Sequence, residues 1–161
     1  MATPKLTHVF TAVMTTAPGI HAAPSKYSNM AAAYVEDGGY ITTADETVKL
    51  KCIGASDWML IHDSNTHTID ARASFIGEDG TNLDLKYMGK ITTTPHVMDI
   101  FSCKPGKEFQ FGEEYYYTCP QISSRSEKFA WVNDCVFLAM GKLRVLEKGN
   151  MELQYRILKV G

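Results

Sequence analysis

The chain has 161 residues, 45% of them hydrophobic and 21% charged, with 16 Lys+Arg against 18 Asp+Glu. The balanced charge excludes the clustered basic excess that nucleic-acid binding needs, and no apolar run approaches the ~20 residues of a membrane-spanning helix. Length and composition are those of one soluble domain with its own core, which we take to span residues 1–161.

Alternation of apolar and polar residues, typical of β-strands, recurs along most of the chain. The first such segment, Leu6–Met14, is interrupted by threonines and favours a strand over the apolar core of a signal peptide. Residues Pro18–Tyr40 have mixed character, and we expect a loop and an edge strand there that could cover the mouth of a barrel. The other predicted strands are Val48–Ile53, Trp58–Ile61, Thr68–Ile76, Asn82–Met88, Tyr115–Cys119, Phe129–Met140, Lys142–Leu146 and Met151–Val160.

Turn-forming residues separate the predicted strands, as at Asp79-Gly80 and Gly149-Asn150. Only one short segment, Pro95–Phe101, has helical character. Many short strands with turn residues between them predict an all-β fold, either a barrel or a sandwich.

The four cysteines contain no Cys-x-x-Cys pair, which excludes the usual zinc-ribbon and thioredoxin-like sites. Without a secretory signal we expect reduced thiols in a cytoplasmic protein. His62 and His67 flank a short turn and could share a metal, but two histidines leave the ligand set incomplete, and we predict no metal site. The nucleotide-binding and common hydrolase motifs are missing, and we predict no cofactor.

Asp70 and Arg72 lie two apart in the predicted strand Thr68–Ile76, so both side chains point to the same face. On the outside of a barrel they would form a solvated ion pair that contributes about 0–1 kcal/mol. Inside a barrel they would be a desolvated acid and base, which is unfavourable unless the pair has a role. The pattern alone leaves both placements open.

Aromatic residues form a second cluster. Tyr115 and Tyr117 share one face of a predicted strand, and Trp131 and Asn133 share one face of another. Such stripes are more often part of a core than of a ligand site. The amide of Asn133, on an otherwise apolar face, needs a hydrogen-bond partner from protein, water or ligand.

Taken together, these segments resemble a family of small bacterial and fungal β-barrel proteins known as domain of unknown function 3237. The resemblance covers about residues 38–160. Three departures are Tyr117-Thr118-Cys119, where the tyrosine-rich strand of the family usually continues with Phe-Arg-Thr, Gly54-Ala55 in place of Gly-Gly, and the diverged region Thr92–Phe111. The matching segments are Gly38-Gly39, Gly54-Ala55-Ser56-Asp57-Trp58, Ile69-Asp70-Ala71-Arg72, Asp79-Gly80, Gly89, Tyr116-Tyr117 and Ala130-Trp131-Val132-Asn133.

The resemblance implies a single up-and-down antiparallel β-barrel of the lipocalin-like type, with one mouth open to an interior ligand pocket. It implies that Asp70, Arg72, Trp131 and Asn133 line that pocket. It also implies natural-product chemistry, because fungal members resemble enzymes that act without a cofactor on polyketide- or phenylpropanoid-like substrates.

The first functional hypothesis is a cofactor-independent isomerase or cyclase for a hydrophobic polyketide- or phenylpropanoid-like intermediate, acting by proton transfer or pericyclic ring closure. Arg72 would stabilise an enolate or phenoxide, Asp70 would orient Arg72 or move a proton, and Tyr117 would add a hydrogen bond. The substrate would be bound by Trp58, Tyr87, Trp131 and Asn133.

Two alternatives stay open. The first is a non-catalytic small-molecule-binding barrel, a carrier or accessory protein, and the second is a structural barrel with a filled interior. Turnover that is lost on Arg72→Ala while binding survives would separate the enzyme from the carrier. The expected partner is a small hydrophobic or aromatic molecule, and edge strands and exposed aromatics are compatible with a homodimer.

Overall fold

The computed structural model describes residues 3–18, 21–22, 29–35, 38–62 and 65–161. The helices in these residues are α1 (Pro95–Phe101) and the 3-10 helix η1 (Glu127–Asp134). The strands are β1 (Leu6–Thr15), β2 (His21–Ala22), β3 (Met30–Tyr34), β4 (Tyr40–Thr43), β5 (Lys49–Leu60), β6 (Thr66–Ile76), β7 (Asn82–Thr92), β8 (Glu108–Phe109), β9 (Tyr116–Ser123), β10 (Phe137–Val145) and β11 (Met151–Val160).

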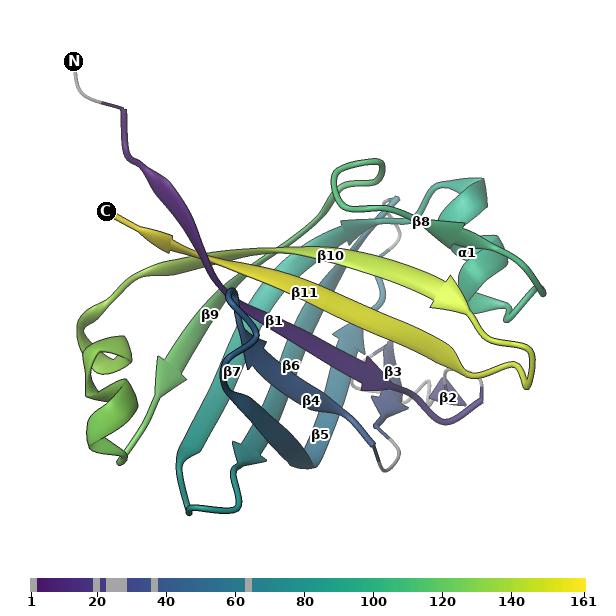
Figure 1. Cartoon of the computed structure of the whole chain (residues 1–161). Helices are drawn as coiled ribbons and strands as arrows, with labels where there is room; N and C mark the ends of the chain where they lie inside the picture. Colours follow the sequence, from purple (N-terminus) through teal and green to yellow (C-terminus); the bar gives the residue numbers. More distant parts are fainter. Residues whose placement is uncertain (1–2, 19–20, 23–28, 36–37, 63–64) are drawn as a thin grey trace.

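Within the described residues, the sheet closes into a barrel of eight antiparallel strands (Figure 1). The order around the barrel is β1-β4-β5-β6-β7-β9-β10-β11, and pairing of β1 with β11 completes the ring. β3 pairs with the second half of β5 beside β4, and β2 pairs with β3. This up-and-down arrangement confirms the predicted fold class.

The alternating sequence places every second side chain inside the barrel. In β9, for example, Tyr116 and Thr118 are buried whereas Tyr117 and Cys119 are exposed. A shift of one residue would exchange the inner and outer faces of a strand, so the register decides which chemistry faces the interior.

Two segments that were predicted as separate strands, Val48–Ile53 and Trp58–Ile61, belong to the single strand β5. Its register against β6 shifts between Cys52 and Gly54, which marks a β-bulge. The glycine therefore bends the strand instead of ending it.

The bulge also changes which residues of β5 point inward. Before the bulge the inward side chains are Leu50 and Cys52, which occupy even positions. After it they are Asp57 and Met59, which occupy odd positions, and Trp58 is turned to the outside with 40% of its surface exposed.

The predicted strand Phe129–Met140 is wrong in its first half, because Glu127–Asp134 forms η1 and the strand starts at Phe137. Phe129 and Val132, three residues apart, are buried as on one side of a helix. The Phe129 ring meets the ring of Phe10 at 5.5 Å between centroids. η1, the light green helix at the left of Figure 1, thus covers one end of the barrel.

The predicted helix at Pro95–Phe101 is confirmed as α1. Its first turn is capped by Thr94, whose hydroxyl accepts a hydrogen bond from the Val97 N–H at 3.2 Å, and Pro95 occupies the first helical position. α1 lies at the end of the barrel opposite η1 (Figure 1). Neither α1 nor any other helix in the described residues has the length and apolar character that crossing a bilayer requires.

Replacing Phe129 with alanine is expected to lower the free energy of unfolding by about 3–5 kcal/mol, because it opens a cavity between η1 and the barrel. Urea denaturation followed by circular dichroism measures the change. Lys128→Ala, at an exposed position of the same helix, is the control and should stay within about 0.5 kcal/mol of the wild type. Equal stability of the two variants would contradict a core role for η1.

Candidate functional site

Three tyrosine side chains from different strands meet inside the barrel. Tyr87 of β7, Tyr116 of β9 and Tyr155 of β11 are all buried. The Tyr155 ring packs edge-on against the other two, with centroids 5.0 Å from that of Tyr87 and 5.4 Å from that of Tyr116. The hydroxyls of Tyr116 and Tyr155 are hydrogen-bonded to each other. We call these three residues the tyrosine cluster.

A carboxyl group, that of Asp57 on β5, faces the same interior. Its partners in the neighbouring strands are Ala33 of β3 and Ala71 of β6, whose small side chains leave space beside it. The Oδ1 atom of Asp57 is buried and has no hydrogen-bond partner among the residues that the structure describes. A buried polar atom of this kind is unfavourable unless a ligand or water uses it, so Asp57 is a candidate for contact with a bound molecule.

Burial raises the pKa of Asp57 from its usual value of 3.8 to about 7. A hydrogen bond from the Asp70 backbone opposes this rise, and the charge of the Asp70 carboxylate adds to it. Burial also raises the pKa of each phenol in the tyrosine cluster, and the charge of Asp57 contributes to that rise. Near neutral pH the phenols are therefore hydrogen-bond donors, whereas Asp57 can both take up and release a proton.

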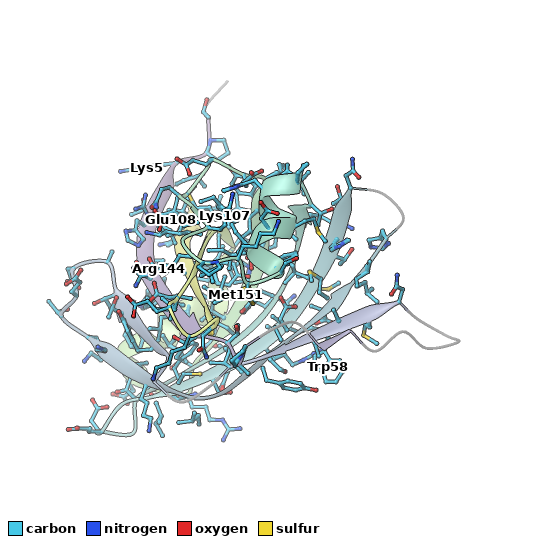
Figure 2. The ribbon with its side chains drawn as sticks, turned by 90° about the vertical axis from the view of Figure 1, so that its right-hand side faces the viewer. Lys5, Trp58, Lys107, Glu108, Arg144 and Met151 are labelled. Carbon is cyan, nitrogen blue, oxygen red and sulfur yellow. The ribbon has the colours of Figure 1, made fainter. Side chains whose placement is uncertain are left out.

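Asp57 and Tyr116 lie on the wall of a cavity of about 40 Å³, between α1, β3 and the barrel strands. This space is enough for a few water molecules. The cavity lies at the end of the molecule that Figure 2 shows, where Met151 is labelled. The rest of the wall is mostly apolar and comprises Thr16, Ala31, Ala33, Met59, Ile69, Ile91, Phe101, Leu143, Met151 and Leu153. The arrangement is one ionisable group and one phenol in an apolar chamber.

Asp70 and Arg72 lie on the outer face of β6, and the expectation that they line the pocket is wrong for this structure. Arg72 Nη1 is 3.4 Å from Asp70 Oδ1, and the two side chains are 59% and 36% exposed. The apolar residues between and beside them, Ile69 and Ala71, fill the interior instead. The pair is thus the solvated alternative that the sequence left open.

Tyr117 and Trp58 also point outward, and in each case the preceding residue points inward. Tyr117 packs on Tyr115 outside the barrel, while Tyr116 joins the tyrosine cluster. Figure 2 shows Trp58 projecting away from the interior, while Asp57 lines the cavity. The sequence analysis missed Tyr116 and Asp57; the signal that could have found Asp57 is Gly54, since a glycine inside a strand indicates a bulge. Tyr87, which was expected to bind the substrate, is buried in the interior but is not among the residues that line the cavity.

Trp131 and Asn133 belong to η1, and neither is among the residues that line the cavity beside Asp57, where they were expected. The Trp131 ring stacks on that of Phe10, with centroids 5.8 Å apart and an angle of 6° between the planes. The side-chain oxygen Oδ1 of Asn133 accepts a hydrogen bond from the backbone N–H of Ser124 at 3.1 Å. The side-chain Nδ2 of Asn133 donates to the backbone carbonyls of Ser124 and Ala130, both at 3.0 Å. The partner that the Asn133 amide requires is therefore the protein backbone, which fastens η1 to the end of β9.

The two histidines that could share a metal lie in different surroundings. The ring of His67 is buried, and this burial lowers its pKa. His62 Nε2 is 2.7 Å from the hydroxyl of Thr68, which also accepts a hydrogen bond from Lys90 Nζ. In the part of the chain that the structure describes, no three His, Cys, Asp or Glu side chains come together as a metal-binding group.

A family model described as protein of unknown function (DUF3237) matches residues 4–160 of the chain. No curated protein matches it.

Several solved structures are similar to the barrel over 100% of this chain. A conserved protein of unknown function from Rhodopseudomonas palustris has a TM-score of 0.80 at 13% identity, with 99% of that chain covered. A β-barrel-like protein from Acinetobacter baumannii AYE has a TM-score of 0.67 at 17% identity, with 98% covered. An enzyme from Penicillium herquei has a TM-score of 0.64 at 15% identity, with 97% covered. At these identities the likeness shows the fold alone.

Asp57→Asn is expected to make the protein more stable than the wild type above pH 7. Folding raises the pKa of Asp57 from 3.8 to about 7, so between these values the folded state keeps a proton that the unfolded chain has lost. Wild-type stability therefore falls as the pH rises through this window and levels off above it. By the size of the shift, the loss is at most about 4 kcal/mol, and asparagine, which does not ionise, escapes it.

Urea unfolding of both proteins from pH 4 to pH 8 measures this difference, and ¹³C NMR titration of the aspartate carboxyls identifies the group. The exposed Asp134 provides the control variant Asp134→Asn, whose pH profile should run parallel to that of the wild type. Parallel profiles for the wild type and Asp57→Asn would contradict the raised pKa.

Proposed function

The chain belongs to the DUF3237 family, and we propose that it is a cofactor-independent isomerase or cyclase acting on a hydrophobic polyketide- or phenylpropanoid-like molecule. The observation that carries the proposal is the Asp57 carboxyl, which lines an apolar cavity and has one buried oxygen without a hydrogen-bond partner in the described part of the chain. The site proposed here is the interior one, formed by Asp57 and the tyrosine cluster, and not the outer pair Asp70 and Arg72.

Asp57 is suited to proton transfer by its position and by its pKa. A general base works best when its pKa lies near the working pH, since it must accept a proton from one atom and return it to another. Burial brings the pKa of Asp57 to about 7, which meets this condition. Among the described residues, the Oδ1 atom of Asp57 has no hydrogen-bond partner, so this oxygen is available to a bound molecule.

The phenols of the tyrosine cluster are suited to stabilising negative charge on oxygen. Tyr116 lies on the cavity wall, and its hydroxyl is bonded to that of Tyr155. When Tyr155 donates to Tyr116, the proton of the Tyr116 hydroxyl is free to bond an enolate or phenoxide oxygen. Such a donor, fixed in a dry site, is worth more than it would be in water.

The proposed reaction needs no external reagent. The Asp57 carboxylate takes a proton from an acidic C–H or O–H of the substrate, and Tyr116 stabilises the oxyanion that forms. In an isomerisation, the protonated Asp57 returns this proton to a different atom. In a ring closure, the oxygen or carbon nucleophile adds to a conjugated double bond of the same molecule, and Asp57 protonates the carbanion that results. Substrate and product are isomers in both cases, so atoms and electrons balance.

A polyketide-sized molecule needs more room than the cavity of about 40 Å³ offers, and side chains at its open end must move to admit it. Met59 and Met151 lie on this wall, and methionine is the apolar side chain best able to rearrange. An enzyme from Penicillium herquei has the same fold, which supports the view that such a barrel can hold a catalytic site.

The test is to incubate a panel of phenolic and polyketide intermediates with the wild type, with Asp57→Asn and with Arg72→Ala, and to separate isomers by liquid chromatography with mass spectrometry. We expect the wild type to form a product of unchanged mass, and Asp57→Asn to slow its formation by about 10²- to 10⁴-fold. Arg72→Ala, at an outer position, should retain the wild-type rate.

The other outcomes decide between the remaining hypotheses. A compound that binds the wild type and is recovered unchanged would favour the carrier. Turnover that is lost in Arg72→Ala but kept in Asp57→Asn would contradict the interior site and favour the outer pair.

A further inference from the structure

The start of β9 is flanked by two glycines, one on each of its neighbouring strands. Gly89 of β7 is opposite Thr118 of β9, and Gly141 of β10 lies against the Tyr116 ring. Both glycines lie in the middle of a strand, where glycine usually weakens the sheet. Glycine at such a position often marks a place where another part of the protein approaches the backbone closely.

At Gly141 the reason is the aromatic ring of Tyr116. A Cβ atom at this position would lie 2.1 Å from Tyr116 Cδ1 and 2.3 Å from Cε1, far closer than non-bonded carbon atoms approach. The ring thus occupies the space that any other side chain at position 141 would fill. Position 141 faces inward on β10, two residues before Leu143 on the cavity wall.

At Gly89 the obstacle is backbone. A Cβ atom there would lie 2.2 Å from the carbonyl oxygen of Tyr117 and 2.7 Å from the Cα of Thr118. The start of β9 therefore approaches β7 closely at Gly89 and presents the Tyr116 ring to β10 at Gly141. The two glycines together accommodate the segment that carries the phenol.

We propose that Gly141 is a positioning residue for the Tyr116 phenol. By lacking a side chain, it lets the ring lie against β10, where its hydroxyl bonds that of Tyr155 and its ring meets Phe109 at 6.2 Å between centroids. A methyl group at position 141 pushes the ring out of this orientation and breaks the bond between the two hydroxyls. The inference deepens the proposed function, because it concerns the hydroxyl assigned there to the oxyanion.

The experiment follows the hydrogen bond between the Tyr116 and Tyr155 hydroxyls by NMR in the protein without substrate. A hydroxyl proton buried in a hydrogen bond exchanges slowly, and a signal that is lost in both Tyr116→Phe and Tyr155→Phe is assigned to this bond. We expect Gly141→Ala to abolish or strongly shift this signal. Leu138→Ala is the control, because Leu138 lies on the outer face of the same strand with 38% of its surface exposed. A signal that is unchanged in Gly141→Ala would overturn the proposal.

A second comparison covers the case in which Gly141→Ala does not fold. Gly141→Ala should lower the Tm by many degrees in the wild-type background but have little effect when added to Tyr116→Leu, because leucine lacks the ring that the methyl group strikes. An equal loss of Tm in both backgrounds would mean that the glycine serves the β10 backbone, which would overturn the proposal.

These readouts need no turnover, so they separate the two proposals. A wild type that converts nothing in the substrate panel would contradict the proposed function and leave the hydroxyl signal as the test of Gly141. If turnover is found, Gly141→Ala should lower kcat with KM nearly unchanged, since the phenol acts on charge that develops during the reaction.

Discussion

Pairing of β1 with β11 closes the sheet, and this closure divides every strand into residues that face the interior and residues that face solvent. An open sheet could tolerate a local slip at its edge, but a closed one fixes each register against both neighbours. The bulge at Gly54 is therefore decisive, since it exchanges the two faces of β5 for the rest of the strand. That exchange puts a carboxyl group inside the barrel and a tryptophan outside it.

The interior that results combines two kinds of surroundings with opposite effects on stability. Around η1, rings such as Phe10 and Phe129 pack against one another and contribute to the core. Around Asp57, one carboxyl oxygen is buried and has no hydrogen-bond partner among the described residues, which destabilises the folded state. Proteins keep buried polar groups without partners where function needs them. The well-packed aromatic residues around η1 stabilise the fold and offset the destabilising effect of the buried Asp57 carboxyl.

The sequence predicted the barrel well and its site poorly, for reasons that particular residues make clear. The alternation in Leu6–Met14, Thr68–Ile76 and Met151–Val160 extends over most of each segment, so strands and fold class followed from it. Asp57 was missed because a single inserted residue reverses the pattern after Gly54. η1 was mistaken for a strand because apolar residues at positions 129, 131 and 132 fit a short strand as well as a helix turn. For Asp70 and Arg72, the pattern could place both on one face but could not say which face was inside.

Because η1 covers one end of the barrel (Figure 1), the two ends differ in the access that they give a small molecule to the interior. In the described residues, the cavity beside Asp57 lies toward the end with α1 and β3, and the proposed substrate and product would share this route. Arrival and departure would then compete for one opening, so accumulated product would slow its own formation. Phe101 of α1 and Ala31 and Ala33 of β3 contribute to the cavity wall, whereas Asp57 belongs to β5. Substitutions in α1 or β3 would therefore alter which molecules the cavity admits without changing the carboxyl group itself.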